Sequence, residues 1–201
     1  MITKEIIEDM VKIGNRDIGA GFAPLVIAEI GINHGGDVNL AKKMVLEAYK
    51  SGCECVKHQT HFVHDEMTPE AKNIYPPNAE KSIWEVMEEC ALSPDEEISL
   101  KSYTEDLGMI YISTPFSRAA AEFLYDIGVP AFKIGSGECN HLPLIKHIAK
   151  FSKPVIMSTG MQTIEGLKPS IEILQESNID YALLECTNFC LLYTSPSPRD
   201  S

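Results

Sequence analysis

The stretch AFKIGSGECN (131–140) joins a short apolar run to a cluster of polar residues at its carboxyl end. The first four residues have the composition of a buried strand, interrupted only by Lys133. Two glycines flank Ser136, and Glu138 follows them. A strand that only filled a core would not gather a cation, a hydroxyl, flexible backbone and a carboxylate at one end. The stretch therefore predicts a buried strand whose tip belongs to a functional site.

Five further apolar runs of similar length occur along the chain, and helical patterns fill the intervals between them. Most successive runs start 22 to 29 residues apart, which matches repeated βα units and therefore a parallel sheet. Ser93-Pro94 and Thr163 resemble helix starts. The expected strands are residues 25–31, 55–60, 109–115, 131–137, 154–160 and 181–187, and the expected helices are residues 39–52, 82–93, 94–108, 117–128, 142–151 and 163–177.

Two segments outside this repeat also carry information. The polar segment 61–81 is too long for an idle connection in a compact domain, so we expect a loop that contributes to the site. Ahead of the first strand, KIGNRDIG (12–19) places turn residues between short apolar pairs. That pattern predicts a small hairpin.

Parallel βα units either close into a barrel or form an open, doubly wound sheet. Polar or glycine residues end five of the six runs. This distribution favours a barrel, because a barrel collects every strand tip at one mouth, whereas an open sheet concentrates its site at a switch point. The predicted fold class is α/β, a (β/α)8 TIM barrel. A complete barrel typically needs about 250 residues, so about six of the eight βα units are expected in these 201 residues.

The composition limits the classes of partner. With 44% hydrophobic and 23% charged residues the chain is globular, and a net charge of −12 without a basic stretch argues against nucleic acid or an anionic membrane. Charged residues interrupt the amino terminus and no later segment reaches membrane-spanning length, so we expect a cytoplasmic protein. The six cysteines form no CxxC pair, which disfavours a structural zinc site or a disulfide framework.

The segment KHQTH (57–61) places Lys57 and Gln59 on one face of its strand and His58 on the other, because side chains alternate. A lysine within an apolar strand needs an anionic partner, since an unpaired buried ammonium is costly. That partner is either a ligand or a carboxylate on a neighbouring strand. His58 and His61 point to opposite faces of an extended segment, which disfavours metal binding by this pair.

Other strand ends carry carboxylates and hydroxyls. EIGINHGG (29–36) begins with Glu29, which is either a sugar-binding carboxylate or a charged strand end in solvent. ISTPFS (112–117) and MSTGM (157–161) place hydroxyls before a helix start, where they suit phosphate oxygens or cap the helix. Together with Lys57 and Lys133 they favour a shared anion. Glu138 would then lie beside a bound phosphate ester, a position suited to acid–base chemistry.

These segments together resemble the N-acetylneuraminate (sialic acid) synthase family, from about residue 12 to residue 188. The resemblance implies a (β/α)8 barrel followed by a small antifreeze-like domain, in a domain-swapped homodimer. It implies a reaction that joins phosphoenolpyruvate, N-acetylmannosamine and water to give N-acetylneuraminate and phosphate. A divalent ion, Mn²⁺ or Mg²⁺, would activate the open-chain aldehyde. The matching segments, in family order, are IAEIGINHGG, VKHQTH, ISTPFSRAAAEFL, AFKIGSGECN, VIMSTGM and LLECTN.

The resemblance also implies roles for single residues. Glu138 is the expected catalytic residue, which handles protons around the reacting carbons or positions the attacking water. Glu29 and Asn78 are expected to contact the amino sugar. The metal-binding histidines of the family belong to later strands, so no residue of this chain is expected to bind the metal. The residues expected to bind phosphoenolpyruvate are Lys57, Thr114, Lys133, Ser136, Ser158 and Asn188.

The last residues depart from the family pattern, because Phe189-Cys190 stands where a Tyr-Pro pair is usual. The following SPSP (195–198) cannot continue a central strand or helix. We therefore expect residues 1–188 to form a partial TIM-barrel synthase domain and residues 189–201 to be a non-native or disordered tail. The antifreeze-like domain is expected to be absent, and such a chain to be inactive alone.

Three alternatives stay open from the sequence. A legionaminate or pseudaminate synthase would use the same motifs on a related sugar. A catalytically inactive fragment would bind phosphoenolpyruvate without turnover. A Schiff-base aldolase of the sialic acid lyase type would use Lys57 or Lys133 as its nucleophile.

Overall fold

The computed structural model describes residues 10–76 and 80–186. The predictions for Asn78, for Asn188 and for the tail at 189–201 lie outside the described residues.

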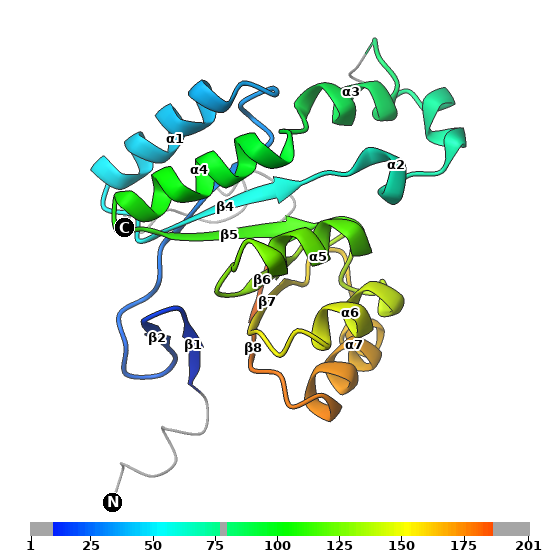
Figure 1. Cartoon of the computed structure of the whole chain (residues 1–201). Helices are drawn as coiled ribbons and strands as arrows, with labels where there is room; N and C mark the ends of the chain where they lie inside the picture. The colour runs from blue at the N-terminus through cyan, green and yellow to red at the C-terminus, as the bar shows by residue number, and fades with distance from the viewer. Residues whose placement is uncertain (1–9, 77–79, 187–201) are drawn as a thin grey trace, which may run out of the picture.

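Six parallel strands form one curled sheet in strict chain order, with helices on its outer side (Figure 1). The predicted strands and the predicted parallel arrangement are therefore confirmed, and the sheet is a curled half-barrel. The strands are β3 (Ile27–Gly31), β4 (Cys55–Thr60), β5 (Ile110–Pro115), β6 (Phe132–Ile134), β7 (Val155–Ser158) and β8 (Tyr181–Leu184), and the helices between them include α1 (Val38–Lys50), α4 (Pro94–Asp106), α5 (Arg118–Asp126), α6 (Leu142–Ala149) and α7 (Ile164–Glu176).

Local sequence sets where two of these helices begin. Ser93 and Glu96 form a reciprocal capping box, and Pro94 occupies the first turn of α4, where a missing N–H is tolerated. Thr163 accepts a hydrogen bond from the Gly166 amide at 3.1 Å and caps α7. Both predicted helix starts are confirmed.

Apolar side chains cover both faces of the sheet. On the outer face, Val56, Tyr111 and Phe132 belong to a large cluster that includes residues of the covering helices. On the inner face, Cys55 and Ile112 belong to a second, smaller cluster that also contains Ala131, Ile156 and Ile13. The inner cluster forms an apolar floor inside the half-barrel.

The predicted hairpin is present as β1 (Val11–Ile13) and β2 (Arg16–Ile18), paired antiparallel. Gly14 makes its turn with a φ of +61°, a conformation that favours glycine. Ile13 is fully buried in the inner cluster. The hairpin therefore closes the floor of the half-barrel from the side of the strands' amino ends.

The segment after β4 is more structured than the predicted loop. It contains the short helices α2 (Val63–Glu66) and η1 (Pro69–Asn73), and α3 (Ile83–Cys90) follows it. Figure 1 shows α2 and α3 beyond the carboxyl ends of β4 and β5. Val63 and Ala71 bury themselves against Trp84 in a separate small cluster, which gives the segment a core of its own.

Three predicted strands end earlier than expected, and one of them is β8, which stops at Leu184 instead of residue 187. β6 stops at Ile134 instead of residue 137, because the chain turns immediately and the Glu138 amide donates to Gly135 O at 3.1 Å. β7 stops at Ser158 instead of residue 160. In β6 and β7 strand pairing stops where the chain begins to turn, at the glycine and hydroxyl residues that follow the last apolar residues of the strand.

Candidate active site

Above the apolar floor, the inward-facing side chains of neighbouring strands become polar. The strand register places Glu29 beside Lys57, and Gln59 beside Thr114. Side chains alternate along a strand, so residues two apart share a face. The resulting polar layer consists of Glu29 on β3, Lys57 and Gln59 on β4, Thr114 on β5, Lys133 on β6 and Ser158 on β7.

Lys57 finds its partner on the neighbouring strand. Its Nζ lies 2.7 Å from Glu29 Oε2, and the lysine side chain is 7% exposed while the glutamate side chain is 55% exposed. This contact is the carboxylate alternative left open by the sequence. The buried charge of Lys57 is thus balanced by a carboxylate that still faces the open mouth, where a substrate can reach it.

Lys133 is buried among neutral groups. Its Nζ donates to Ser158 Oγ at 2.6 Å and to Ile134 O at 2.9 Å, and among the described residues no carboxylate lies within ion-pair distance of it. Burial, followed by the nearby charge of Lys57, lowers the pKa of Lys133 from 10.5 to about 8. An anion placed between these groups would relieve both effects.

Thr114 adds an unused hydroxyl to the same layer. The residue is 1% exposed, and its Oγ1 has no hydrogen-bond partner within residues 10–76 and 80–186. A buried hydroxyl without a partner is costly. A ligand oxygen in the polar layer would satisfy it.

The tips after β6, β7 and β8 meet around the thiol of Cys186. Burial alone would raise the pKa of Cys186, but the nearby hydroxyls of Ser158 and Ser136 and the amides of Thr159 and Gly160 lower it overall. Gly160 N also donates to Ser136 Oγ at 3.0 Å. These hydroxyls and amides lie near one another at the strand tips, so this end of the polar layer favours negative charge. The sequence analysis missed Cys186, although it lies within LLECTN.

Glu138 lies at the mouth, just past the tip of β6. Its Oε2 accepts a hydrogen bond from His141 Nδ1 at 2.8 Å. Together with Glu66, Met67 and Phe116 it lines a cavity of about 250 Å³. The carboxylate is therefore available to a molecule in the mouth, and His141 is a partner that the sequence did not indicate.

The hydroxyl motifs separate into different roles. Ser117 accepts from the Ala120 amide and caps α5, so the capping alternative is correct for this residue. Ser113 faces outward, where its Oγ lies 2.7 Å from Thr60 Oγ1. Thr114 and Ser158 are the hydroxyls of these motifs that belong to the polar layer.

The two histidines of KHQTH point to opposite faces, as predicted. His58 Nδ1 lies 3.3 Å from Glu97 Oε1 on the outer face, whereas His61 Nδ1 lies 2.9 Å from Glu66 Oε1 at the mouth. The described residues contain no group of three or more His, Cys, Asp or Glu side chains able to hold a metal ion. They therefore do not supply the donor set for the Mn²⁺ or Mg²⁺ that the resemblance implies.

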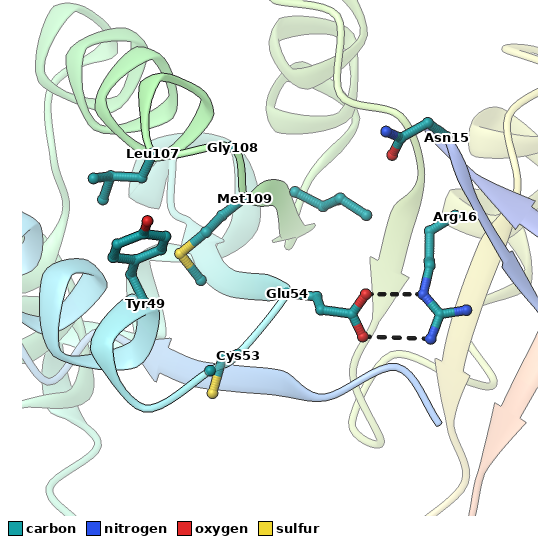
Figure 2. A pocket seen from close by; sticks show the side chains of 10 residues that line it. Asn15, Arg16, Tyr49, Cys53, Glu54, Leu107, Gly108 and Met109 are labelled. Atoms are coloured by element: carbon teal, nitrogen blue, oxygen red, sulfur yellow. Dashed lines mark hydrogen bonds and ion pairs between the residues drawn. The ribbon is translucent and has the colours of Figure 1, made fainter. Parts of the chain in front are cut away.

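A separate cavity of about 390 Å³ lies at the amino ends of β4 and β5 (Figure 2). On its rim, Arg16 Nε donates to Glu54 Oε2 at 2.9 Å and Arg16 Nη2 donates to Ala23 O at 2.7 Å. The guanidinium is thus engaged in attaching the hairpin to the sheet. This cavity lies on the floor side and is not continuous with the polar layer.

Comparison with known proteins decides the family. Residues 44–195 match the sequence model of the NeuB family. The chain belongs to the NeuB family. This match confirms the resemblance found in the sequence.

Relatives with known names lie on several branches of the NeuB family. N-acetylneuraminate-9-phosphate synthase of Mus musculus is 32% identical over 178 residues, which cover 86% of this chain and 49% of that protein. N,N'-diacetyllegionaminic acid synthase of Legionella pneumophila is 34% identical over 185 residues, which cover 87% and 52%. This chain therefore spans about half the length of these NeuB relatives.

A solved NeuB-type structure has the same fold over nearly the whole chain. The N-acetylneuraminic acid synthetase of Leptospira borgpetersenii, in complex with citrate, superposes with a TM-score of 0.77 at 26% identity. The superposition covers 90% of this chain and 60% of that one. Within the described part of the chain, no helix combines the length and apolar character needed to cross a bilayer.

Proposed function

We propose that this chain carries the phosphoenolpyruvate site of a NeuB-family synthase that makes N-acetylneuraminate from phosphoenolpyruvate, N-acetylmannosamine and water. One observation carries the proposal. Lys133 is 3% exposed and is held by neutral oxygens, beside a second buried lysine. A buried ammonium that has no carboxylate partner of its own and lies near a second ammonium is unfavourable without an added anion.

The polar layer offers donors for both charged ends of phosphoenolpyruvate. Lys57 and Lys133 supply charge, which strengthens hydrogen bonds to carboxylate and phosphate oxygens. The Thr114 hydroxyl supplies a buried donor that has no partner among the described residues. Ser136 and Ser158, which surround Cys186, supply hydroxyls at the far end. The citrate bound by the Leptospira relative is likewise a small, multiply charged carboxylate.

Glu138 is placed to move protons in the proposed reaction. The methylene carbon of phosphoenolpyruvate forms a bond to the aldehyde carbon, the aldehyde oxygen takes a proton, and water supplies the oxygen that replaces phosphate. Removing the protons of that water needs a base at the mouth. Glu138, held by His141 at 2.8 Å, is the carboxylate that the sequence and the cavity both indicate.

The described residues indicate the identity of the sugar less clearly than that of phosphoenolpyruvate. Glu29 faces the mouth and would accept from its hydroxyls, and Asn78 is proposed for the same substrate. The Legionella relative is named for a legionaminic acid, so a legionaminate-type or pseudaminate-type sugar is the alternative substrate. The Mn²⁺ or Mg²⁺ requirement, the homodimer and the cytoplasmic location also stay predictions.

An aldolase is the second candidate, and the lowered pKa of Lys133 favours it, because a Schiff base forms through a neutral amine. Borohydride trapping in the presence of pyruvate separates the two. An aldolase becomes covalently labelled at Lys133 or Lys57, whereas a synthase does not. Membership of the NeuB family favours the synthase.

Calorimetry with phosphoenolpyruvate tests the proposal directly on the chain. We expect saturable binding that Lys133→Met weakens by roughly 10- to 150-fold, the contribution of a charged hydrogen bond. Lys146→Met on the exposed side of α6 is the matched control and should leave binding unchanged. Equal binding by both variants would contradict the proposed site, and binding without product would identify an inactive fragment.

A further inference from the structure

A chain of three side chains links the long segment after β4 to the polar layer. Glu66 on α2 places both carboxylate oxygens near His61 Nδ1, at 2.9 and 3.1 Å. His61 Nε2 lies 3.3 Å from Gln59 Oε1 on β4. The His61 and Glu66 side chains are 3% and 4% exposed. This Glu66–His61–Gln59 chain is therefore a buried connection that ends on an inward-facing amide.

Packing fixes the middle member of the chain. The His61 ring stacks on Phe116, with ring centroids 4.4 Å apart and an angle of 14° between the planes. Phe116 and Glu66 line the same cavity as Glu138. The imidazole thus has one face covered and both nitrogens engaged, directly beside the mouth.

The acceptors around His61 determine how it donates. Both ring nitrogens face oxygen atoms, of a carboxylate on one side and of an amide on the other. Gln59 Oε1 can only accept, so His61 Nε2 is the donor of their contact. The Gln59 oxygen is then occupied, and the Gln59 NH₂ group is the part of the amide left to donate.

The position of that NH₂ group indicates which substrate it meets. Gln59 is one inward-facing position nearer the mouth than Lys57, beside Thr114 in the register. A Cβ atom placed on Gly31 would lie 4.0 Å from Gln59 Nε2, so the amide lies against the start of the loop that follows Glu29. No described residue accepts a hydrogen bond from Nε2.

We propose that His61 and Glu66 are positioning residues that hold the Gln59 amide with its nitrogen toward the mouth, where it donates to an oxygen of the neutral sugar substrate. The inference rests on the proposed function for the identity of that substrate. It assigns the anion to the two lysines and the uncharged partner to an amide, which recognises hydroxyl or carbonyl oxygens without adding charge. The segment carrying α2 thereby contributes to substrate selection.

Nuclear magnetic resonance of the ¹⁵N-labelled chain tests the geometry without any activity. We expect His61 Nε2 to carry a proton in the unaltered chain, because it donates to Gln59 Oε1. His64, which is mostly exposed, is the control ring in the same spectrum. A His61 ring with a bare Nε2 nitrogen in the unaltered chain would overturn the proposed orientation.

Ligand titration tests the contact itself. With phosphoenolpyruvate present, N-acetylmannosamine should shift the Gln59 side-chain NH₂ signals. His61→Phe, which keeps a ring on Phe116, and Glu66→Gln should each weaken sugar affinity roughly 3- to 10-fold, the contribution of one neutral hydrogen bond. Phenylalanine or glutamine at these positions should leave phosphoenolpyruvate affinity unchanged. His64→Phe is the matched control and should change neither affinity.

The outcomes separate this inference from the proposed function. Unmoved Gln59 signals at saturating sugar, or an equal loss of both affinities in the two variants, would overturn the positioning role. Failure of phosphoenolpyruvate to shift the Thr114 and Ser158 signals would instead overturn the proposed function. The tautomer of the His61 ring in the free chain is measured independently of that failure.

Discussion

Lys133 on β6 donates a 2.6 Å hydrogen bond to Ser158 on β7, and no described carboxylate lies within ion-pair distance of this lysine. The pKa of Lys133 is lowered to about 8, first by burial and then by the charge of Lys57. The protonated form is therefore destabilised in the free protein. An anionic ligand would stabilise it, so binding and protonation of Lys133 are coupled.

The coupling predicts how phosphoenolpyruvate affinity depends on pH. Below about pH 8 Lys133 is already charged, so the affinity should be nearly constant, and it should fall as pH rises beyond that value. Binding near pH 8.5 should take up protons. Calorimetry in two buffers of different ionisation enthalpy measures this uptake. Equal affinity at pH 7.5 and pH 9.5 would exclude Lys133 from the site.

The same lysine predicts an opposite trend in stability. Its folded-state pKa of about 8 lies below the ordinary value of 10.5, so between these values the unfolded chain holds more protons and stability rises with pH. At pH 7 the loss of folding free energy from burying the protonated Lys133 is on the order of 3 kcal/mol. Lys133→Met should therefore unfold at higher urea concentration than the unaltered chain at pH 7. A variant less stable than the unaltered chain would show that Lys133 contributes to folding.

Glu29 separates the effects on the two substrates. Glu29→Gln removes a negative charge 2.7 Å from Lys57, so phosphoenolpyruvate should bind more tightly while the sugar binds more weakly. The buried Lys57 loses its partner in this variant, so the free energy of unfolding should fall as well. Glu54→Gln, which removes a comparable carboxylate from the pair with Arg16 on the floor side, is the matched control. Weaker phosphoenolpyruvate binding in Glu29→Gln would count against an anion beside Lys57.

Glu138 should be needed for turnover and not for binding. In an active enzyme of the length of its relatives, Glu138→Gln should lower kcat by about 10²–10⁴-fold, as expected for a general acid–base group. The affinity for phosphoenolpyruvate should stay within about 3-fold, because one neutral hydrogen bond contributes no more. Product formation followed in parallel with calorimetry gives both values. A kcat close to that of the unaltered enzyme would remove Glu138 from the mechanism.

Glu97 on α4 should be the carboxylate on which stability depends most. It accepts from Thr60 Oγ1 at 2.6 Å and Tyr111 OH at 2.9 Å, and it lies 3.3 Å from His58 Nδ1. Glu97→Ala leaves several buried donors without an acceptor and should cost about 3 kcal/mol or more. Urea unfolding measures this cost. Glu105→Ala, at an exposed position of the same helix, should cost well under 1 kcal/mol.

The sequence predicted the strands because each apolar run is bounded by turn residues and separated from the next by a helical pattern. Alternation along the strand also predicts that Lys57 and Gln59 share one face. Alternation does not predict which group pairs with Lys57. Lys57 could bind a ligand or a carboxylate, and only the register of β3 against β4 brings Glu29 to it.

Partners from distant parts of the chain were missed for the same reason. Glu97 has the sequence context of an ordinary acidic residue in the first turn of a helix. Its burial follows from how α4 packs over β4 and β5, which no local pattern contains. Cys186 similarly gains its donors only when the tips after β6, β7 and β8 converge.

The hairpin at the floor has a consequence for the order of assembly. Ile13 leaves the ribosome long before Ile112, Ala131 and Ile156, the residues of three later strand regions against which it is buried. The hairpin is thus made before the later strands that cover it, and it is among the last elements to find its final place. Until β7 emerges, this end of the chain exposes an apolar hairpin that has to avoid other partners.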